Sequence, residues 1–232
     1  MRERYRIIRA PRGYSVSFDL RDSVPALAPA VIFDVGANVG QSAELFLRAY
    51  PAAKIYCFEP VAASFHALRE TLAEKGGQVE LHQLAMGAER GQARIATSGT
   101  GTCATMMTPA TAGYQQSEEI RVDTLDTFCS DAGITRIDYL KIDTEGNDLN
   151  VLRGAEHLLG DGGATVVEVE AGMHPENRLH VPLEDLKAHL QEYGYRCFGI
   201  YEPVAEWTTG EPFLRRVNAV FIAPSLYNSG SP

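Results

Sequence analysis

Short apolar runs alternate with segments of helical periodicity from residue 31 onward. The first run, 31–35, is apolar apart from Asp34 and predicts a strand buried on both faces, as strands of parallel sheets are. Apolar residues three and four apart then predict a helix over 39–50, which Pro51 ends. Further strands are predicted at 54–60, 78–87, 137–143 and 164–170.

Helices are predicted after the second, fourth and fifth of these strands. Their apolar stripes are Phe65, Leu68 and Leu72; Leu149, Leu152, Ala155 and Leu159; and Leu183, Leu186, Leu190 and Tyr193. Two apolar runs, 196–203 and 216–224, follow without a helix between them, so these strands must pair antiparallel. The pattern predicts an α/β fold with a doubly wound, mostly parallel sheet and one antiparallel strand near the C-terminal edge.

One domain over 31–224 accounts for this rhythm, with an extension at 1–30 and a tail at 225–232. A short β-arm is expected at 91–97. Residues 97–119 are rich in Thr, Gly and Ala and predict a long loop. Such a loop either closes over an acceptor, with Met106 and Met107 as adaptable contacts, or is a surface loop without a role.

Charge and cysteine content narrow the function classes. Thirty acidic against 21 basic residues give a net charge of -9, which disfavours a nucleic-acid partner. The four cysteines form no C-x-x-C pair, so neither a disulfide framework nor a zinc site is indicated. No apolar run approaches the roughly 20 residues that cross a bilayer, and the first residues lack the apolar core of a signal peptide. We expect a soluble, cytoplasmic chain of open oligomeric state.

A glycine turn follows the first strand. It nearly spells the dinucleotide fingerprint G-x-G-x-x-G, but Asn38 replaces the middle glycine. Gly36 permits the tight turn and Gly40 permits close packing of the next helix, whereas the side chain of Asn38 disfavours close approach of a pyrophosphate.

Glu59 ends the second strand, placed to accept hydrogen bonds from both ribose hydroxyls of an adenosine. An adenosine without a pyrophosphate therefore fits this turn best. S-adenosylmethionine meets that description, because its amino-acid end can approach the turn and Asp34. The alternative is that the glycines only shape the turn and that Glu59 is a solvated strand end.

Acidic residues also gather after the fourth strand, in YLKIDTEGNDLNVLRGAEHLL. Asp143, Glu145 and Asp148 follow this strand at the edge of the sheet where the reactive end of a cofactor is expected. An acid there can hold an ammonium group, bind the acceptor, act as a base or ligate a cation.

The segments FDVGANVGQ, FEP, VDTLDTF and LKIDTEGNDLNVLRGA resemble the FkbM family of S-adenosylmethionine-dependent methyltransferases, in the same order and over roughly residues 31–222. The resemblance implies a Rossmann-like class I methyltransferase fold and methylation of hydroxyl groups on sugars, glycans or polyketide rings. It places Ala85 and Met86 near the adenine, and Asp143 and Glu145 as the acids of the fourth strand. The implied cofactor contacts are Asp34, Gly36, Asn38, Gly40, Glu59 and Asp143. Little sequence precedes the first strand, so any cap over the acceptor is expected to be small or absent.

An alcohol is a weak nucleophile and needs a base or a metal ion to draw off its proton. Asp143, Glu145 and Glu170 are candidates, and His174, in the loop after the fifth strand, is the preferred base. Asp143 with Glu170 is a candidate Mg²⁺ pair. The alternatives are that the histidine is merely exposed and that the acids are helix caps.

The sequence therefore predicts an enzyme that methylates a hydroxyl of a small-molecule or glycan acceptor, a sugar or a secondary metabolite. Two other classes stay open. One is a nicotinamide-dependent oxidoreductase or epimerase, which Asn38 disfavours. The other is a non-catalytic module that binds an adenosine cofactor, which the acids at Asp143, Glu145 and Glu170 disfavour.

Overall fold

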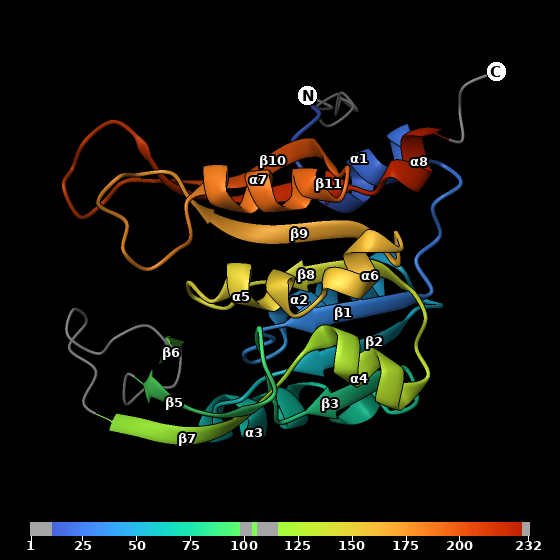
Figure 1. Cartoon of the computed structure of the whole chain (residues 1–232), viewed down its shortest axis with the longest axis vertical. Helices are drawn as coiled ribbons and strands as arrows, with labels where there is room; N and C mark the ends of the chain where they lie inside the picture. The colour runs from blue at the N-terminus through green and yellow to red at the C-terminus, as the bar shows by residue number, and fades with distance from the viewer. Residues whose placement is uncertain (1–10, 98–103, 106–115, 229–232) are drawn as a thin grey trace, which may run out of the picture.

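The central element is a seven-stranded sheet in the order β10-β11-β9-β8-β1-β2-β3 (Figure 1). The computed structural model describes residues 11–97, 104–105 and 116–228. Strands β1, β2, β3, β8 and β9 run parallel, and β11 runs antiparallel to both β9 and β10. The bounds are β1 Val31–Val35, β2 Lys54–Phe58, β3 Val79–His82, β8 Ile137–Ile142, β9 Ala164–Gly172, β10 Arg196–Ala205 and β11 Leu214–Ile222. The predicted mostly parallel sheet with an antiparallel strand near one edge is confirmed.

Helices cover both faces of the sheet, and each side has its own apolar core. One face packs against α4 Leu125–Ala132, α5 Asp148–Arg153, α6 Glu156–Gly160 and α7 Leu183–Glu192. The other packs against α1 Val16–Ser23, α2 Gln41–Ala49 and α3 Ala62–Thr71, which the short helix η1 Ala73–Lys75 follows. Helix α8 Pro224–Asn228 follows β11. Among the described residues, no helix is both long and apolar enough to span a membrane.

The strand order reverses between β1 and β8. From β1 the chain proceeds to β2 and β3 on one side, whereas β8 and β9 continue the sheet on the other. A crevice opens outside the carboxyl ends of the strands at such a reversal, because the connections leave in opposite directions. The fold therefore brings the glycine turn after β1 and the acids after β8 to one place.

The strand predicted over 78–87 is interrupted. Its second part, β4 Ala85–Met86, leaves the main sheet and pairs with β7 Gln116–Asp123. Strand β7 also pairs with β5 Gly91–Thr97, which continues to β6 Ala104–Thr105, so a second sheet of order β4-β7-β5-β6 forms.

The expected β-arm at 91–97 is thus present as β5, but the single loop expected over 97–119 is wrong in part, since β6 and the start of β7 lie within it. Ile95 and Ile120 pack with Val61 in a small core of their own, which gives these strands one buried face. Met106 and Met107 lie outside the described residues.

The helix predicted over 149–159 breaks into α5 and α6 at Gly154. A Cβ at Gly154 would lie 2.0 Å from the carbonyl oxygen of Gly87, so the chain needs a glycine to pass there. Leu152, Ala155 and Leu159 still face the same core, which explains why their spacing looks continuous.

The N-terminal extension docks on the sheet through α1. The Leu20 side chain is 1% exposed and packs among residues of the core beneath α2. The carboxylate of Asp19 accepts hydrogen bonds from the Tyr201 hydroxyl (3.0 Å) and from the Gly13 N–H (2.6 Å). These contacts join the extension to β10.

Replacing Leu20 by Ala tests this docking. We expect a loss of about 2–5 kcal/mol in the free energy of unfolding, because a buried leucine leaves a cavity behind. Leu45, on α2 and 59% exposed, is the matched control and should change stability by less than about 0.5 kcal/mol. Urea unfolding of both variants gives the comparison, and equal losses would mean that α1 is not packed on the sheet.

Candidate active site

A cavity of about 710 Å³ lies at the carboxyl ends of the parallel strands. Its walls come from the turn after β1, the end of β2, the segment before and through β4, the acids after β8, and α1 and α2. This volume lies in the range of sites for cofactors and drug-sized ligands. Of the predicted site residues, Gly36, Asn38, Glu59, Ala85, Met86, Asp143, Glu145 and Glu170 line it.

The turn after β1 depends on left-handed backbone. Gly36 has a φ of +85°, and a Cβ there would lie 1.9 Å from the carbonyl oxygen of Asp143. Asn38 has a φ of +49°, a region that asparagine enters more readily than most residues. This is why an asparagine can occupy the position of the middle glycine. Gly40 does not line the cavity; a Cβ there would meet Leu68 of α3 at 3.1 Å.

Glu59 is held in place by the backbone. Its Oε2 accepts the N–H of Asn38 (3.0 Å), and its Oε1 accepts the N–H of Val61 (2.9 Å). Burial raises the pKa of Glu59 to about 7. A carboxylate has about four acceptor sites, so each oxygen retains capacity for a ligand hydroxyl. The geometry therefore suits the ribose contact predicted for Glu59.

An apolar wall lies beside Glu59. Ala85 and Met86 are 5% and 1% exposed, and they line the cavity together with Phe58 and Ile95. The Asn147 side chain donates to the Met86 carbonyl oxygen (3.0 Å) and so ties this wall to the segment after β8. A flat aromatic base would be accommodated there.

Three buried charges lie side by side across the sheet. Asp34 on β1 is in register with Lys141 on β8, which is in register with Glu168 on β9. Lys141 and Glu168 line the cavity, whereas Asp34 lies beneath it and is fully buried. Neither carboxylate oxygen of Asp34 makes a hydrogen bond within the part of the chain that the structure describes. Burial raises the pKa of Asp34 to about 6.

Asp143 is engaged by Lys141. Its Oδ2 lies 2.8 Å from Lys141 Nζ. Burial alone would raise the pKa of Asp143, but the ammonium of Lys141, a hydrogen bond with Glu170 and the charge of Arg216 together lower it. Asp143 is therefore a carboxylate held charged at the wall of the cavity. The side chain of Asp143 also lies within hydrogen-bond reach of Glu170, so the predicted cation pair of Asp143 with Glu170 stays a prediction.

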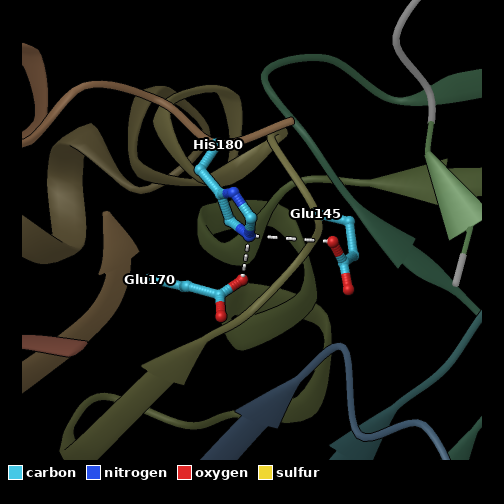
Figure 2. A group of neighbouring side chains, drawn as sticks. All are labelled: Glu145, Glu170 and His180. Atoms are coloured by element: carbon cyan, nitrogen blue, oxygen red, sulfur yellow. Dashed lines mark ion pairs between the residues drawn. The ribbon is translucent and has the colours of Figure 1, made fainter. Parts of the chain in front are cut away.

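Glu170 instead gathers with Glu145 and His180 (Figure 2). His180 Nε2 lies 2.8 Å from Glu170 Oε2 and 3.8 Å from Glu145 Oε2. Glu170 also forms an ion pair with Arg216 through its other oxygen. Glu145 has a φ of +50°, an uncommon conformation that is often found at functional sites. Burial and the neighbouring Glu170 raise the pKa of Glu145.

His180 lies in the segment between β9 and α7 and was not predicted from the sequence. A histidine in an irregular segment has no periodic signal, and its partner Glu170 precedes it by ten residues without a recognisable motif. Arg216 was missed likewise, because its position on β11 reads as an ordinary strand residue.

His174, the preferred base, does not line the cavity. Its Nε2 is bonded to Glu211 Oε2 (2.7 Å), and its Nδ1 accepts the N–H of Glu176 (3.2 Å). These contacts connect the segment after β9 to the connection between β10 and β11.

The model of the Methyltransferase FkbM domain matches residues 34–197. Similar curated proteins include the 2-O-methyltransferase NoeI of Sinorhizobium fredii, 29% identical over 56% of this chain and 58% of the relative. The hexuronic acid methyltransferase AglP of Haloferax volcanii is 26% identical over 63% of this chain and 59% of that protein. The 31-O-demethyl-FK506 methyltransferase FkbM of Streptomyces tacrolimicus is 27% identical over 66% and 67%. The chain thus spans less than two thirds of the first two relatives. A precorrin-6y C5,15-methyltransferase from Geobacter metallireducens has a TM-score of 0.49 at 14% identity, over 92% of each chain.

Gly36→Ala tests the close approach of the turn to Asp143. Gly77→Ala is the matched control, because Gly77 also has a positive φ (+94°) but no heavy atom within 4 Å of the added Cβ. The control should lose about 1–2 kcal/mol of unfolding free energy from backbone strain. Gly36→Ala should lose about 1–3 kcal/mol more, because the backbone of Asp143 must move. Urea unfolding measures both, and similar losses would contradict the clash.

Asp34→Asn should stabilise the fold near neutral pH. Because the pKa of Asp34 is raised to about 6 from 3.8, the folded chain retains a proton that the unfolded chain has released between these values. The contribution of Asp34 to the unfolding free energy therefore falls as the pH rises from about 4 to about 6, and stays low above that.

The free energy of unfolding of Asp34→Asn should exceed that of the wild type by about 1–3 kcal/mol at about pH 8 and equal it at about pH 4. Urea unfolding at the two pH values checks this. A difference that does not change with pH would contradict the raised pKa.

Proposed function

Because the chain belongs to the Methyltransferase FkbM domain family, we propose that it transfers a methyl group from S-adenosylmethionine to a hydroxyl oxygen of a sugar or secondary metabolite. The observation that carries this proposal is a single cavity that joins Glu59 and the glycine turn to the acids after β8. One end suits an adenosine and the other a reacting hydroxyl. Transfer to oxygen is supported by the relatives, since NoeI is a 2-O-methyltransferase and the Streptomyces protein is a 31-O-demethyl-FK506 methyltransferase.

The residues around the cavity fit this cofactor. Glu59 would accept the ribose hydroxyls, Ala85 and Met86 would contact the adenine, and Asp143 would attract the ammonium of the amino-acid end. The side chain of Asn38 occupies the place where a pyrophosphate would need bare backbone. S-adenosylmethionine supplies a methyl group that its sulfonium charge already activates. The protein is left to position the acceptor and receive its proton.

The groups placed to receive that proton are Glu145 and Glu170, which line the cavity, and His180, which lies beside them. We assign Asp143 to positioning, since Lys141 holds it charged. The ring of His174 is hydrogen-bonded to Glu211, so we propose that it anchors the segment after β9. The base function is assigned to the cluster of Glu145, Glu170 and His180. A general base typically accelerates such a reaction by about 10²–10⁴-fold.

Calorimetric titration with S-adenosylhomocysteine, with NAD as the control ligand, tests the cofactor. We expect saturable micromolar binding of the first and none of the second. Binding of NAD alone would favour the oxidoreductase alternative. A non-catalytic module would bind S-adenosylhomocysteine but transfer no labelled methyl group to any hydroxylated acceptor.

Glu59→Ala should weaken binding of S-adenosylhomocysteine by about 1–3 kcal/mol, because two hydrogen bonds to a charged acceptor are lost. Glu70→Ala, on α3 and outside the cavity, is the control and should leave the affinity unchanged. Calorimetry gives both dissociation constants. An unaltered affinity in Glu59→Ala would remove this residue from the binding site.

A further inference from the structure

The geometry points to a binding site for a divalent transition-metal ion, Mn²⁺ or Zn²⁺, formed by Glu145, Glu170 and His180 (Figure 2). One ligand atom from each residue lies within 4.8 Å of the other two. Binding of the ion stands on these residues alone. Its role beside the reacting hydroxyl rests on the proposed function.

The spacing suits one ion. Nε2 of His180 is 2.8 Å from Glu170 Oε2 and 3.8 Å from Glu145 Oε2. Neighbouring ligands of a tetrahedral ion with bonds of about 2.1 Å lie roughly 3.4 Å apart, between these two values. Glu170 is 4% exposed, and its Oε2 makes no hydrogen bond within the described residues despite its closeness to the ring. The two atoms form an ion pair when the ring is protonated, and an ion bound between them would take the place of that proton.

The tautomer of His180 is set by its neighbour Asn177. The Asn177 side chain donates through Nδ2 to the Arg215 carbonyl oxygen (2.9 Å), and its Oδ1 accepts the N–H of Leu179 (3.1 Å). Oδ1 is therefore an acceptor toward His180 Nδ1 (3.0 Å), which must carry the hydrogen. In the neutral ring the lone pair is then on Nε2, which faces the two glutamates. An N–H fixed behind the ring in this way is the usual arrangement of a metal-ligating histidine.

The ligands are held by the surrounding structure. The N–H of Glu170 donates to Asp148 Oδ1 (3.3 Å), and its second carboxylate oxygen pairs with Arg216. Glu145 is presented by the left-handed turn after β8. The ligands thus come from three separate segments that packing holds together, which is the preorganisation that a metal site requires.

The charge around the site favours a cation. Four carboxylates meet here, those of Asp143, Glu145, Asp148 and Glu170, and the fixed cations that face them are Lys141 and Arg216. The carboxylates repel one another in a largely buried region, where Asp148 is fully buried and Glu170 is 4% exposed. A doubly charged ion would offset this repulsion.

The donor set selects the kind of ion. Mg²⁺ and Ca²⁺ take oxygen ligands almost entirely, whereas one imidazole with two carboxylates suits Zn²⁺ or Mn²⁺. Three protein ligands leave a position open, as in catalytic metal sites. Glu145 and Glu170 both line the cavity, so that position faces the space for the acceptor. With the ion bound, the three side chains act as its ligands instead of as the proton acceptor, and a hydroxyl in the open position would lose its proton to solvent more readily.

Titration of the EDTA-treated and dialysed full chain with MnCl₂, ZnCl₂ and MgCl₂, followed by calorimetry, tests the site. We expect one Mn²⁺ or Zn²⁺ per chain, bound at least about tenfold more tightly than Mg²⁺. His180→Gln and Glu170→Gln should each weaken metal binding by roughly a hundredfold or more. Removing a residue that only hydrogen-bonds to a metal ligand typically costs about 10–100-fold in affinity, and loss of a ligand itself should cost at least as much.

His174→Gln is the matched control, because His174 is a similarly buried histidine paired with a glutamate outside the cavity. It should bind the ion as the wild type does. Titration of every variant with S-adenosylhomocysteine shows that each is folded and tests the cofactor proposal separately. Loss of metal binding with retained nucleoside binding supports the site. Absence of a saturable Mn²⁺ or Zn²⁺ site in the wild type, or unaltered binding in His180→Gln, would overturn it, whatever the cofactor titration shows.

Discussion

The site depends on how closely β1 and β8 approach each other where their strands end. The N–H of Asp143 donates to the Val35 carbonyl oxygen (2.9 Å), and the space beside Gly36 is already filled by the Asp143 carbonyl. On the side of β2, the N–H groups of Gly36 and Ala37 both donate to the carbonyl oxygen of Phe58 (2.9 and 3.0 Å). The glycine turn is therefore clamped between β2 and β8. This clamp places Glu59 on one side of the cavity and the acids after β8 on the other.

The same edge of the sheet concentrates buried charge at a cost to stability. Lys141 stands between Asp34 and Glu168 in the sheet and also binds Asp143. Burial raises the pKa of Asp34 and of Glu168, which means that the folded chain disfavours the charged form of both carboxylates. Buried titratable groups with shifted pKa values are typical of functional sites, where a bound ligand can compensate the buried charge.

The N-terminal extension contributes to the cavity. Tyr14, Val16 and Arg21, in or just before α1, are among the residues that line it. The N-terminal extension therefore forms part of the cavity wall, a position that its sequence did not predict. Tyr14 is largely exposed, whereas the buried Leu20 packs α1 against the sheet.

Hydrophobic periodicity predicted the seven strands of the main sheet, its parallel pairing and its antiparallel strand, because these follow from local spacing and from the rules of chain connection. It did not predict helices α1 and α4. The motifs at 34–40 and Glu59 likewise indicated the adenosine end, since a turn and a strand end are local features. Tertiary structure alone decided the rest. It broke the third strand at 83–84 because β4 pairs with β7, and it placed His180, rather than His174, beside Glu145 and Glu170, which line the cavity. Glu170 and His180 lie 25 and 35 residues after Glu145, and all three meet only through packing across β8, β9 and the loop after β9. No spacing along the chain encodes such a meeting.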